Sequence, residues 1–306
     1  GSMTRVLMPF PADAVLAGTI NQPLQARIAP VAWRHFPDGE SLVTLDDALD
    51  GADVAILASL RNADAMALPL RFAARAAREF GARSVGLIAP YLGYMRQDTR
   101  FHPGEAVSTP LFAQFLEESF DWLVTVDPHL HRVERLQSLY RISTAHVSAT
   151  PAVARWIAET VPDAILIGPD SESEQWVAGI SVRSGMPYQV LAKERYGDYD
   201  VRVSLPDPAA VSGRTPVLVD DIVSSGHTIL ETLAHLRRLS LPPPLLVAIH
   251  PVFAGDAYAR LQEAGLARIV STDTIPHPSN AIALGADLAA AASTLMTAST
   301  DSPEDP

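Results

Sequence analysis

The segment PVLVDDIVSSGHTILETL, residues Pro216 to Leu233, predicts the architecture of this chain. An apolar run reaches two adjacent carboxylates, Asp220 and Asp221, and a short turn then leads into a segment with apolar residues at helical spacing. A strand followed by a tight turn and a helix is the repeating unit of sheets whose parallel strands are joined by crossover helices. The segment therefore predicts an α/β fold with mostly parallel sheets flanked by helices.

The turn itself has the composition of a phosphate site. Its backbone amides and hydroxyl groups stand at the start of the predicted helix, where N–H groups without helical partners attract anions. The two carboxylates at the strand end are placed to bind vicinal hydroxyls of a sugar, directly or through a divalent cation. A strand, an acidic turn and a serine-capped helix without a ligand are the alternative. The candidate phosphate-binding residues are Ser224, Ser225, Gly226, His227 and Thr228.

Two comparable series of strands and helices divide the chain. Runs rich in Val, Ile and Leu alternate with helical patterns on both sides of Thr150-Pro151, a cap-like pair that opens the second series. We therefore expect an N-terminal domain at residues 3–148 and a C-terminal domain at 149–306, with a frayed tail at 298–306. This scheme leaves the last helix free to pack back on the N-terminal domain. Residues 199–205 alternate apolar and polar side chains, which predicts a small antiparallel hairpin.

The composition excludes several classes of protein. The 23 Lys and Arg residues against 35 Asp and Glu residues leave a net charge of −12, which disfavours binding to nucleic acid or to an anionic membrane. The chain has no cysteine, so disulfides, thiolate zinc sites and a cysteine nucleophile are excluded. The Ala-rich stretch from Ala281 to Met296 is interrupted by Asp287, and no segment has the pattern of a membrane span. We expect a cytoplasmic protein.

A second motif lies in PYLGYMRQDTRFHPGE, residues Pro90 to Glu105, where a strand ends at two tyrosines and the cluster Arg96, Gln97 and Asp98. Arginine binds phosphate oxygens in bidentate geometry, and Gln97 or Asp98 is placed to meet an adenine or a metal-bound water. Taken alone, the cluster is equally consistent with a charged loop at a strand end. HFPDGE, residues His35 to Glu40, is by itself an ordinary Pro-Asp-Gly turn.

Two further motifs contribute histidines and cations. VTVDPHLHR places Asp127, His129 and His131 at alternate positions of a strand. Neutral imidazole there could serve a divalent metal or a nucleotide phosphate, but a structural role for these histidines is as frequent. Lys193 and Arg195 would project from one side of a strand. There they could neutralise the charge on a transferring pyrophosphoryl group, or they could simply be solvent-exposed charges on an edge strand.

Together and in this order, the motifs resemble those of the ribose-phosphate pyrophosphokinase family, from about Arg5 to the Ala-rich last helix. The resemblance implies two type I phosphoribosyltransferase-like domains, the first with an ATP loop and the second with a ribose 5-phosphate loop. It also implies that the HFPDGE loop reaches a neighbouring subunit, where Phe36 stacks on the adenine of ATP. The complete ATP site would then exist only in a homo-oligomer, a dimer or larger. The implied ATP-binding residues are Phe36, Asp38, Glu40, Arg96, Gln97 and Asp98.

The resemblance assigns metal-binding and catalytic residues as well. The metal-associated positions of the family fall on His129 and Asp170, and its catalytic Lys-x-Arg pair falls on Lys193 and Arg195. Ribose 5-phosphate would bind to Asp220, Asp221 and the turn at 224–228, and Mg²⁺ would bridge the phosphates. The chain departs from the family pattern at residues 171–174, where SESE replaces a Gly-rich turn and Ser171 with Glu174 fits a helix capping box.

The implied activity is transfer of the β,γ-pyrophosphoryl group of ATP to the anomeric hydroxyl of ribose 5-phosphate, which gives phosphoribosyl pyrophosphate and AMP. Two alternatives stay open. A phosphoribosyltransferase acting on a nucleobase would share the phosphate turn, and a non-catalytic regulator associated with a true synthetase would explain the unusual SESE turn.

Overall fold

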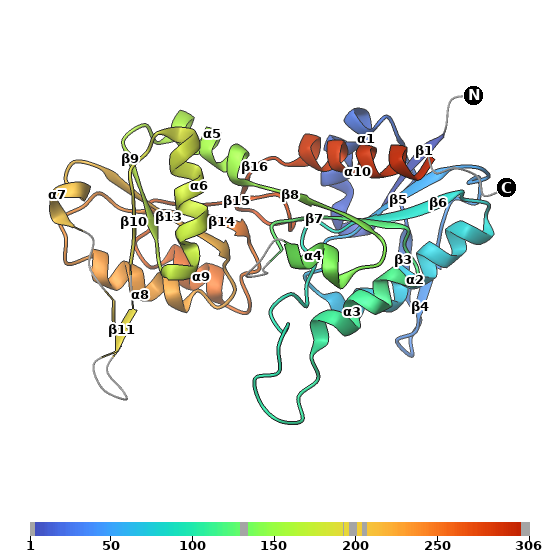
Figure 1. The fold of residues 1–306 in the computed structure, drawn as a ribbon, viewed down its shortest axis with the longest axis horizontal. Helices are drawn as coiled ribbons and strands as arrows, with labels where there is room; N and C mark the ends of the chain where they lie inside the picture. The colour runs from blue at the N-terminus through green and yellow to red at the C-terminus, as the bar shows by residue number, and fades with distance from the viewer. Residues whose placement is uncertain (1–3, 129–133, 192, 196–200, 204–206, 301–306) are drawn as a thin grey trace. The chain divides into compact units, whose positions relative to one another are not determined.

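The computed structural model describes residues 4–128, 134–191, 193–195, 201–203 and 207–300 (Figure 1). These residues form two compact units. Unit 1 contains the chain up to Val147 together with the segment from Gly285 onward, and unit 2 spans Ser148–Leu284. The last helix of the expected C-terminal domain therefore belongs to unit 1.

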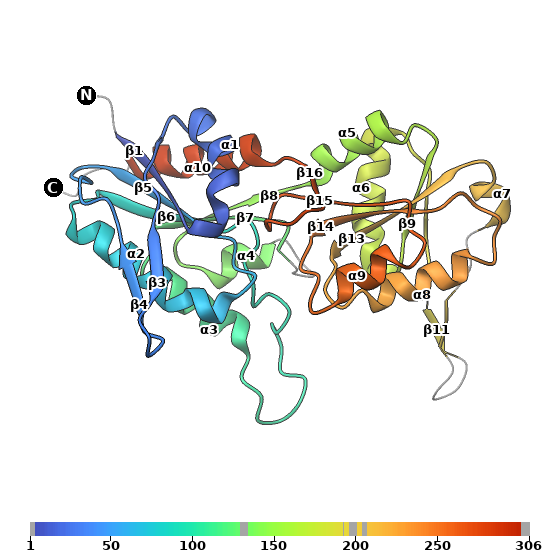
Figure 2. The same ribbon diagram turned by 180° about the vertical axis from the view of Figure 1, so that it is seen from behind.

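Unit 1 is built on a six-stranded parallel sheet in the order β2-β1-β5-β6-β7-β8. Its strands β5, β6 and β7 are buried throughout, as expected when helices cover both faces. Helices α1 and α10 lie on one face and α2 and α3 on the other (Figure 1, Figure 2). The strands are β1 (Arg5–Pro9), β2 (Arg27–Ile28), β5 (Asp53–Leu57), β6 (Ser84–Ile88), β7 (Trp122–Val126) and β8 (Ser143–Val147). The helices are η1 (Pro11–Asp13), α1 (Ala14–Leu24), α2 (Ala63–Glu79), α3 (Ser108–Glu117), α4 (Glu134–Leu139) and α10 (Gly285–Thr300).

Strands β3 (Ala32–His35) and β4 (Ser41–Thr44) form an antiparallel hairpin beside this sheet. Its turn contains the PDG sequence of the HFPDGE motif, and Gly39 there has a φ of +95°. The hairpin carries Phe36 at its tip end, and that ring remains 39% exposed.

Helix α10 completes the core of unit 1 from the far end of the chain. Gly285 approaches α1 so closely that a Cβ atom there would lie 2.1 Å from Thr19 Oγ1. The Arg5 guanidinium, at the start of β1, donates to the Ser293 hydroxyl of α10 at 3.0 Å. Four residues of α10 are fully buried against the rest of unit 1: Leu288, Ala289, Ala292 and Met296.

Unit 2 repeats the parallel-sheet plan with the strand order β10-β9-β13-β14-β15-β16. Helices α5 and α6 lie on one face and α8 and α9 on the other (Figure 1, Figure 2). The strands are β9 (Ala164–Gly168), β10 (Tyr188–Val190), β13 (Thr215–Ile222), β14 (Leu245–His250), β15 (Arg268–Thr272) and β16 (Asn280–Ile282). The helices are α5 (Thr150–Thr160), η2 (Ser171–Ser173), α6 (Glu174–Ser184), α7 (Pro208–Val211), α8 (His227–Leu236) and α9 (Ala257–Gln262).

The predicted small antiparallel pair is confirmed. Strands β11 (Lys193–Arg195) and β12 (Val201–Val203) pair in antiparallel register, with Glu194 opposite Arg202. The other residues of the predicted hairpin, 199–200 and 204–205, lie outside the described residues. Within the described part of the chain, no helix has the length and apolar character needed to cross a membrane.

Candidate active site

Three carboxyl groups lie together at the carboxyl edge of the unit 2 sheet. Asp220 and Asp221 belong to β13, and Asp170 follows the end of the neighbouring strand β9. Burial, together with the charges of Asp221 and Asp170, raises the pKa of Asp220 well above its ordinary value. The Asp221 amide donates to Asp220 Oδ1 and the Ile222 amide donates to Asp221 Oδ1, each at 2.9 Å. A sugar hydroxyl or a cation at this edge would relieve the remaining repulsion.

The predicted phosphate turn lies directly beyond these carboxylates, between the end of β13 and the start of α8. Gly226 occupies the position before the helix with a φ of +78°, which residues with a side chain rarely adopt. A Cβ atom there would lie 3.2 Å from Leu261 Cδ1 of α9. Both the conformation and the packing of the turn therefore favour glycine.

Backbone hydrogen bonds hold this turn in place. Residues 223–224 are joined to residues 250–254, at the end of β14 and just after it, by three hydrogen bonds of 2.8 to 3.2 Å. Ser225 and His227 are exposed and Thr228 is half-buried. Because the first amides of a helix lack acceptors within the helix, the turn presents N–H groups and hydroxyls together, as an anion site requires.

The capping box expected after Asp170 is wrong by one residue. The Asp170 carboxylate accepts the Ser173 amide at 3.1 Å, and Ser173 Oγ accepts the Asp170 amide at 3.2 Å, so these two residues form the box. Ser171 and Glu174 instead lie at the starts of η2 and α6. The reason is the short 3₁₀ turn η2, which delays the helix and shifts the cap to Asp170. Oδ1 of Asp170 is thereby engaged in the cap.

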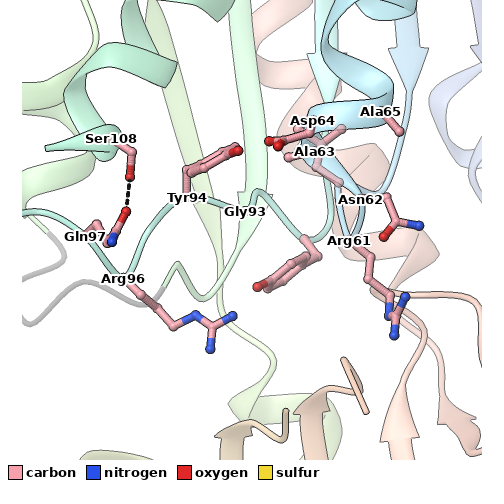
Figure 3. Close-up of a pocket in the computed structure, with 12 residues that line it drawn as sticks. Arg61, Asn62, Ala63, Asp64, Ala65, Gly93, Tyr94, Arg96, Gln97 and Ser108 are labelled. Atoms are coloured by element: carbon pink, nitrogen blue, oxygen red, sulfur yellow. Dashed lines mark hydrogen bonds between the residues drawn. The ribbon is translucent and has the colours of Figure 1, made fainter. Parts of the chain in front are cut away.

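Unit 1 contains a pocket of about 700 Å³ (Figure 3). It is lined by residues 60–65 at the start of α2, by residues of the segment 91–97 that follows β6, and by Ser108 at the start of α3. Two arginines, Arg61 and Arg96, contribute to its wall from different segments, together with the carboxylate of Asp64. The pocket therefore has a local excess of positive charge in a chain whose net charge is −12.

Gln97 is oriented in this pocket by the start of α3. Ser108 Oγ donates to Gln97 Oε1 at 2.7 Å, and the Thr109 amide donates to the Gln97 carbonyl at 3.2 Å (Figure 3). Because its oxygen accepts from Ser108, the Gln97 side chain is left to donate through its amide nitrogen. A nucleobase nitrogen or a phosphate oxygen would be a suitable acceptor.

The other predicted ATP-binding residues do not line the pocket. Asp98 follows Gln97 but is not part of the wall, and Phe36, Asp38 and Glu40 belong to the β3–β4 hairpin of unit 1. The Asp38 carboxylate accepts the Glu40 amide at 3.1 Å, which stabilises the turn. The structure thus brings Arg96 and Gln97 together in one site and leaves the hairpin residues outside it.

The remaining predicted residues are only partly described. His129 lies outside the described residues, whereas the nearby Asp127 is buried, has a φ of +33°, and forms a 2.9 Å hydrogen bond with His146 Nε2 of β8. Lys193 and Arg195 lie in β11.

A magnesium site has to be judged from its donor atoms. Among the described residues, no group of three or more His, Asp and Glu side chains is arranged to hold a metal ion. Mg²⁺ is commonly bound by one or two carboxylates together with substrate phosphates. The carboxyl cluster of Asp170, Asp220 and Asp221 fits such a shared site better than it fits an all-protein cage.

Sequence reasoning missed Arg61 and the Asp127–His146 pair. Arg61 lies in a turn between an apolar strand and a helix, the same arrangement that marks the phosphate turn, but the turn ASLRNAD has no glycine and so no local signal. The partner of Asp127 lies on another strand, and only the pairing of β7 with β8 brings the two together.

Comparisons with known proteins agree over most of the chain. Residues 6–119 match the model of the N-terminal domain of ribose phosphate pyrophosphokinase, and residues 144–277 match that of the phosphoribosyl transferase domain. A ribose-phosphate pyrophosphokinase of Methanopyrus kandleri is 33% identical, over 92% of this chain and 96% of the relative. One of Halobacterium salinarum is also 33% identical, over 85% of this chain and 94% of the relative.

A solved structure supports the fold. The phosphoribosylpyrophosphate synthetase from Mycobacterium smegmatis superposes with a TM-score of 0.80 at 24% identity, covering 96% of this chain and 98% of that one. The two-unit α/β architecture expected from the sequence is therefore confirmed.

Proposed function

Because the chain belongs to the ribose-phosphate pyrophosphokinase family, we propose that it transfers the β,γ-pyrophosphoryl group of ATP to the anomeric hydroxyl of ribose 5-phosphate. The products are phosphoribosyl pyrophosphate and AMP. The observation that carries this proposal is the carboxylate cluster of Asp170, Asp220 and Asp221 directly ahead of a phosphate turn at the start of α8.

In this proposal unit 2 binds the acceptor sugar. The amides and hydroxyls of residues 224–228 hold the 5-phosphate, and Asp220 with Asp221 accepts hydrogen bonds from the ribose hydroxyls. The bonds that tie the turn to residues 250–254 fix the sugar before the reaction, which lowers the entropic barrier to transfer.

Unit 1 binds the donor nucleotide. Arg96 pairs with phosphate oxygens, and Gln97, oriented by Ser108, donates a hydrogen bond to the nucleotide. We further propose that Phe36, Asp38 and Glu40 complete the ATP site of a neighbouring copy, since the exposed Phe36 ring does not line the pocket of its own unit. Sedimentation of the purified protein should then show a dimer or larger species, and a monomer that turns over would contradict a shared site.

The reaction is a single displacement. The anomeric oxygen forms a bond to the β-phosphorus, the bond from that phosphorus to the oxygen shared with the α-phosphorus breaks, and AMP leaves with the electron pair while the hydroxyl proton passes to solvent. Lys193 and Arg195 neutralise the charge that develops on the transferring group. We propose His129 and Asp170 as metal-binding residues, and Mg²⁺ would supply further charge neutralisation there when bound.

The direct test is an assay of AMP formation with and without ribose 5-phosphate. Formation that depends on the sugar supports the proposal. Consumption of phosphoribosyl pyrophosphate in the presence of a nucleobase would instead indicate a phosphoribosyltransferase. Nucleotide binding without turnover at saturating Mg²⁺ would indicate a non-catalytic regulator. Cell fractionation tests the proposed cytoplasmic location, which a membrane-bound enzyme would contradict.

The composition provides a sharp test of Lys193. It is the single lysine of the chain, since the other cationic side chains among the 23 are arginines. An amine-directed acylating reagent should therefore modify Lys193 and the N-terminal amino group alone, and modification should abolish turnover. Lys193→Ala should lower kcat by about 10²-fold or more with little change in thermal stability. Lys193→Arg is the matched control, because any turnover that it retains should resist the reagent. An unchanged rate in Lys193→Ala would remove this residue from the mechanism.

A further inference from the structure

The two units place equivalent turns at equivalent positions. In each sheet the strand order follows the same plan, so β5 in unit 1 corresponds to β13 in unit 2, and α2 corresponds to α8. The turn after β13 is the proposed site of the sugar phosphate. The turn after β5, residues 58–62, carries Arg61 in place of the Ser-rich phosphate sequence.

Arg61 lies in the wall of the same pocket as Arg96. The two side chains come from opposite sides of the opening, Arg61 from the turn before α2 and Arg96 from the segment after β6 (Figure 3). With Asp64 as the acidic side chain in the described wall, the two guanidinium groups leave an excess of positive charge. A polyanion with more than one phosphate group is the ligand that suits this arrangement.

The two segments that carry these arginines are packed tightly against each other. The Leu60 amide donates to the Tyr91 carbonyl at 2.8 Å. Gly93, with a φ of +72°, lies so close that a Cβ atom there would be 3.0 Å from the Leu60 carbonyl oxygen and 3.3 Å from Ala63 Cβ. The backbones that carry Arg61 and Arg96 are therefore fixed relative to each other before any ligand binds.

We propose that Arg61 is a second phosphate-binding residue of the nucleotide pocket, opposite Arg96. The inference rests on the proposed function, since it takes ATP as the occupant of the pocket. Arg61 binds the phosphate chain of the nucleotide. Gln97, Tyr91 and Tyr94, which also line the pocket, contact another part of the same nucleotide. Arg61 is thus a residue that positions the donor and touches its phosphates.

The test is a binding titration of AMP, ADP and ATP, with Mg²⁺ and without ribose 5-phosphate, to wild-type protein and to Arg61→Ala. Loss of a charge-assisted hydrogen bond should raise the Kd for ATP about tenfold or more, whereas the Kd for AMP should change less than about twofold, because the loss concerns phosphates that AMP lacks. Arg61→Lys should recover part of the ATP affinity, since it keeps the charge but not the bidentate geometry. In turnover assays the KM for ATP should rise with a smaller change in kcat.

Arg141→Ala is the matched control. Arg141 is exposed, lies near the amino end of β8 and does not line the pocket. Its removal should leave the affinities for AMP, ADP and ATP unchanged. An ATP affinity of Arg61→Ala equal to that of the wild type, or an equal penalty for AMP and ATP, would overturn the proposal. The titration is independent of turnover, so a chain that binds ATP through Arg61 but forms no AMP would refute the proposed function alone.

Discussion

Asp13 shows what a single residue contributes to the carboxyl edge of the unit 1 sheet. It follows β1 in η1, is 1% exposed, and accepts the Ser59 amide at 3.1 Å, which ties η1 to the end of β5. Its second oxygen has no hydrogen-bond partner among the described residues. Burial therefore raises the pKa of Asp13 to about 6, only partly offset by the Ser59 bond.

Asp13→Asn should stabilise the protein above pH 6. Because the folded pKa exceeds the unfolded value of 3.8, the folded state holds the proton that the unfolded state loses, and stability falls as pH rises from about 4 through 6. The neutral amide keeps the acceptor for Ser59 without this penalty, a gain of roughly 1–3 kcal/mol at pH 7.5. Chemical denaturation of both proteins from pH 4 to pH 8 measures the difference, which should vanish near pH 4. Asp13→Ala, which leaves the Ser59 amide without its acceptor, should be less stable than Asp13→Asn. A stability difference between the wild type and Asp13→Asn that does not change with pH would refute the raised pKa.

Asp220 is expected to lower the stability of the folded protein, because it is a buried carboxyl group beside two others, and it has a proposed role in sugar binding. Asp220→Asn keeps the acceptor for the Asp221 amide and removes the carboxyl group whose ionisation is opposed by burial and by the charges of Asp221 and Asp170. We expect the substrate-free protein to become more stable by roughly 1–3 kcal/mol at pH 8, while kcat/KM for ribose 5-phosphate falls at least about tenfold. Thermal unfolding and the AMP assay measure the two effects. Asp256→Asn, an exposed N-cap of α9, is the control, and a variant that loses both stability and activity would show that the charge is structural.

At the scale of elements, burial decides which parts were predictable. The central strands, such as β5, β6 and β14, are predictable because each is buried throughout and consists mainly of apolar residues. Helix α1 is hard to predict, since its sequence AVLAGTINQPL includes Gly18, Thr19 and Pro23, which have low helix propensity. The edge strand β8, STAHV, is hard to predict because it is largely polar and only partly buried.

The functional sites also differ in how far the sequence predicts them. The phosphate turn and the Arg96–Gln97 cluster could be predicted because each motif is contiguous in the sequence. Arg61 could not be predicted, because its place in the pocket wall depends on the packing of the β5–α2 turn against the segment after β6. Local patterns predict local sites, and contacts between distant segments require the structure.

Gly93→Ala tests the packing of these two segments. The added Cβ atom would meet the Leu60 carbonyl oxygen at 3.0 Å, and the left-handed backbone adds strain of about 1 kcal/mol. We expect the KM for ATP to rise severalfold, with a smaller effect on ribose 5-phosphate. Gly51→Ala is the matched control, since its φ of +69° brings the same strain but its Cβ atom would meet nothing within 4 Å. Equal effects of the two substitutions on ATP would show that strain alone, and not the contact, is responsible.

At the scale of the whole molecule, unit 1 is discontinuous in sequence. Its sheet comes from the N-terminal half of the chain, but α10, from the other end, covers one face of that sheet. Along the sequence, unit 2 falls between these two segments and is formed by one continuous stretch of chain.

Removal of α10 should therefore unfold unit 1 and spare unit 2. A chain ending at Leu284 exposes the surface that α10 covers, and we expect proteolysis to degrade residues before 148 while a fragment near 148–284 persists. In the full chain, Met296→Ala should cost about 2–5 kcal/mol, because this side chain is fully buried. Thr294→Ala, on the exposed side of α10, should cost less than about 1 kcal/mol. A truncated chain that resists proteolysis throughout would contradict this view.

The split of unit 1 also orders events on the ribosome. Domains generally acquire their structure in the order in which they are translated, yet here the first unit to begin is the last that can finish. When Leu284 has been added, every residue of unit 2 has been synthesised, while the sheet of unit 1 still awaits the final helix. The N-terminal half must then remain incomplete through the synthesis of its neighbour, so the nascent chain carries a sheet face that α1 covers only in part and for which a chaperone is the natural temporary partner.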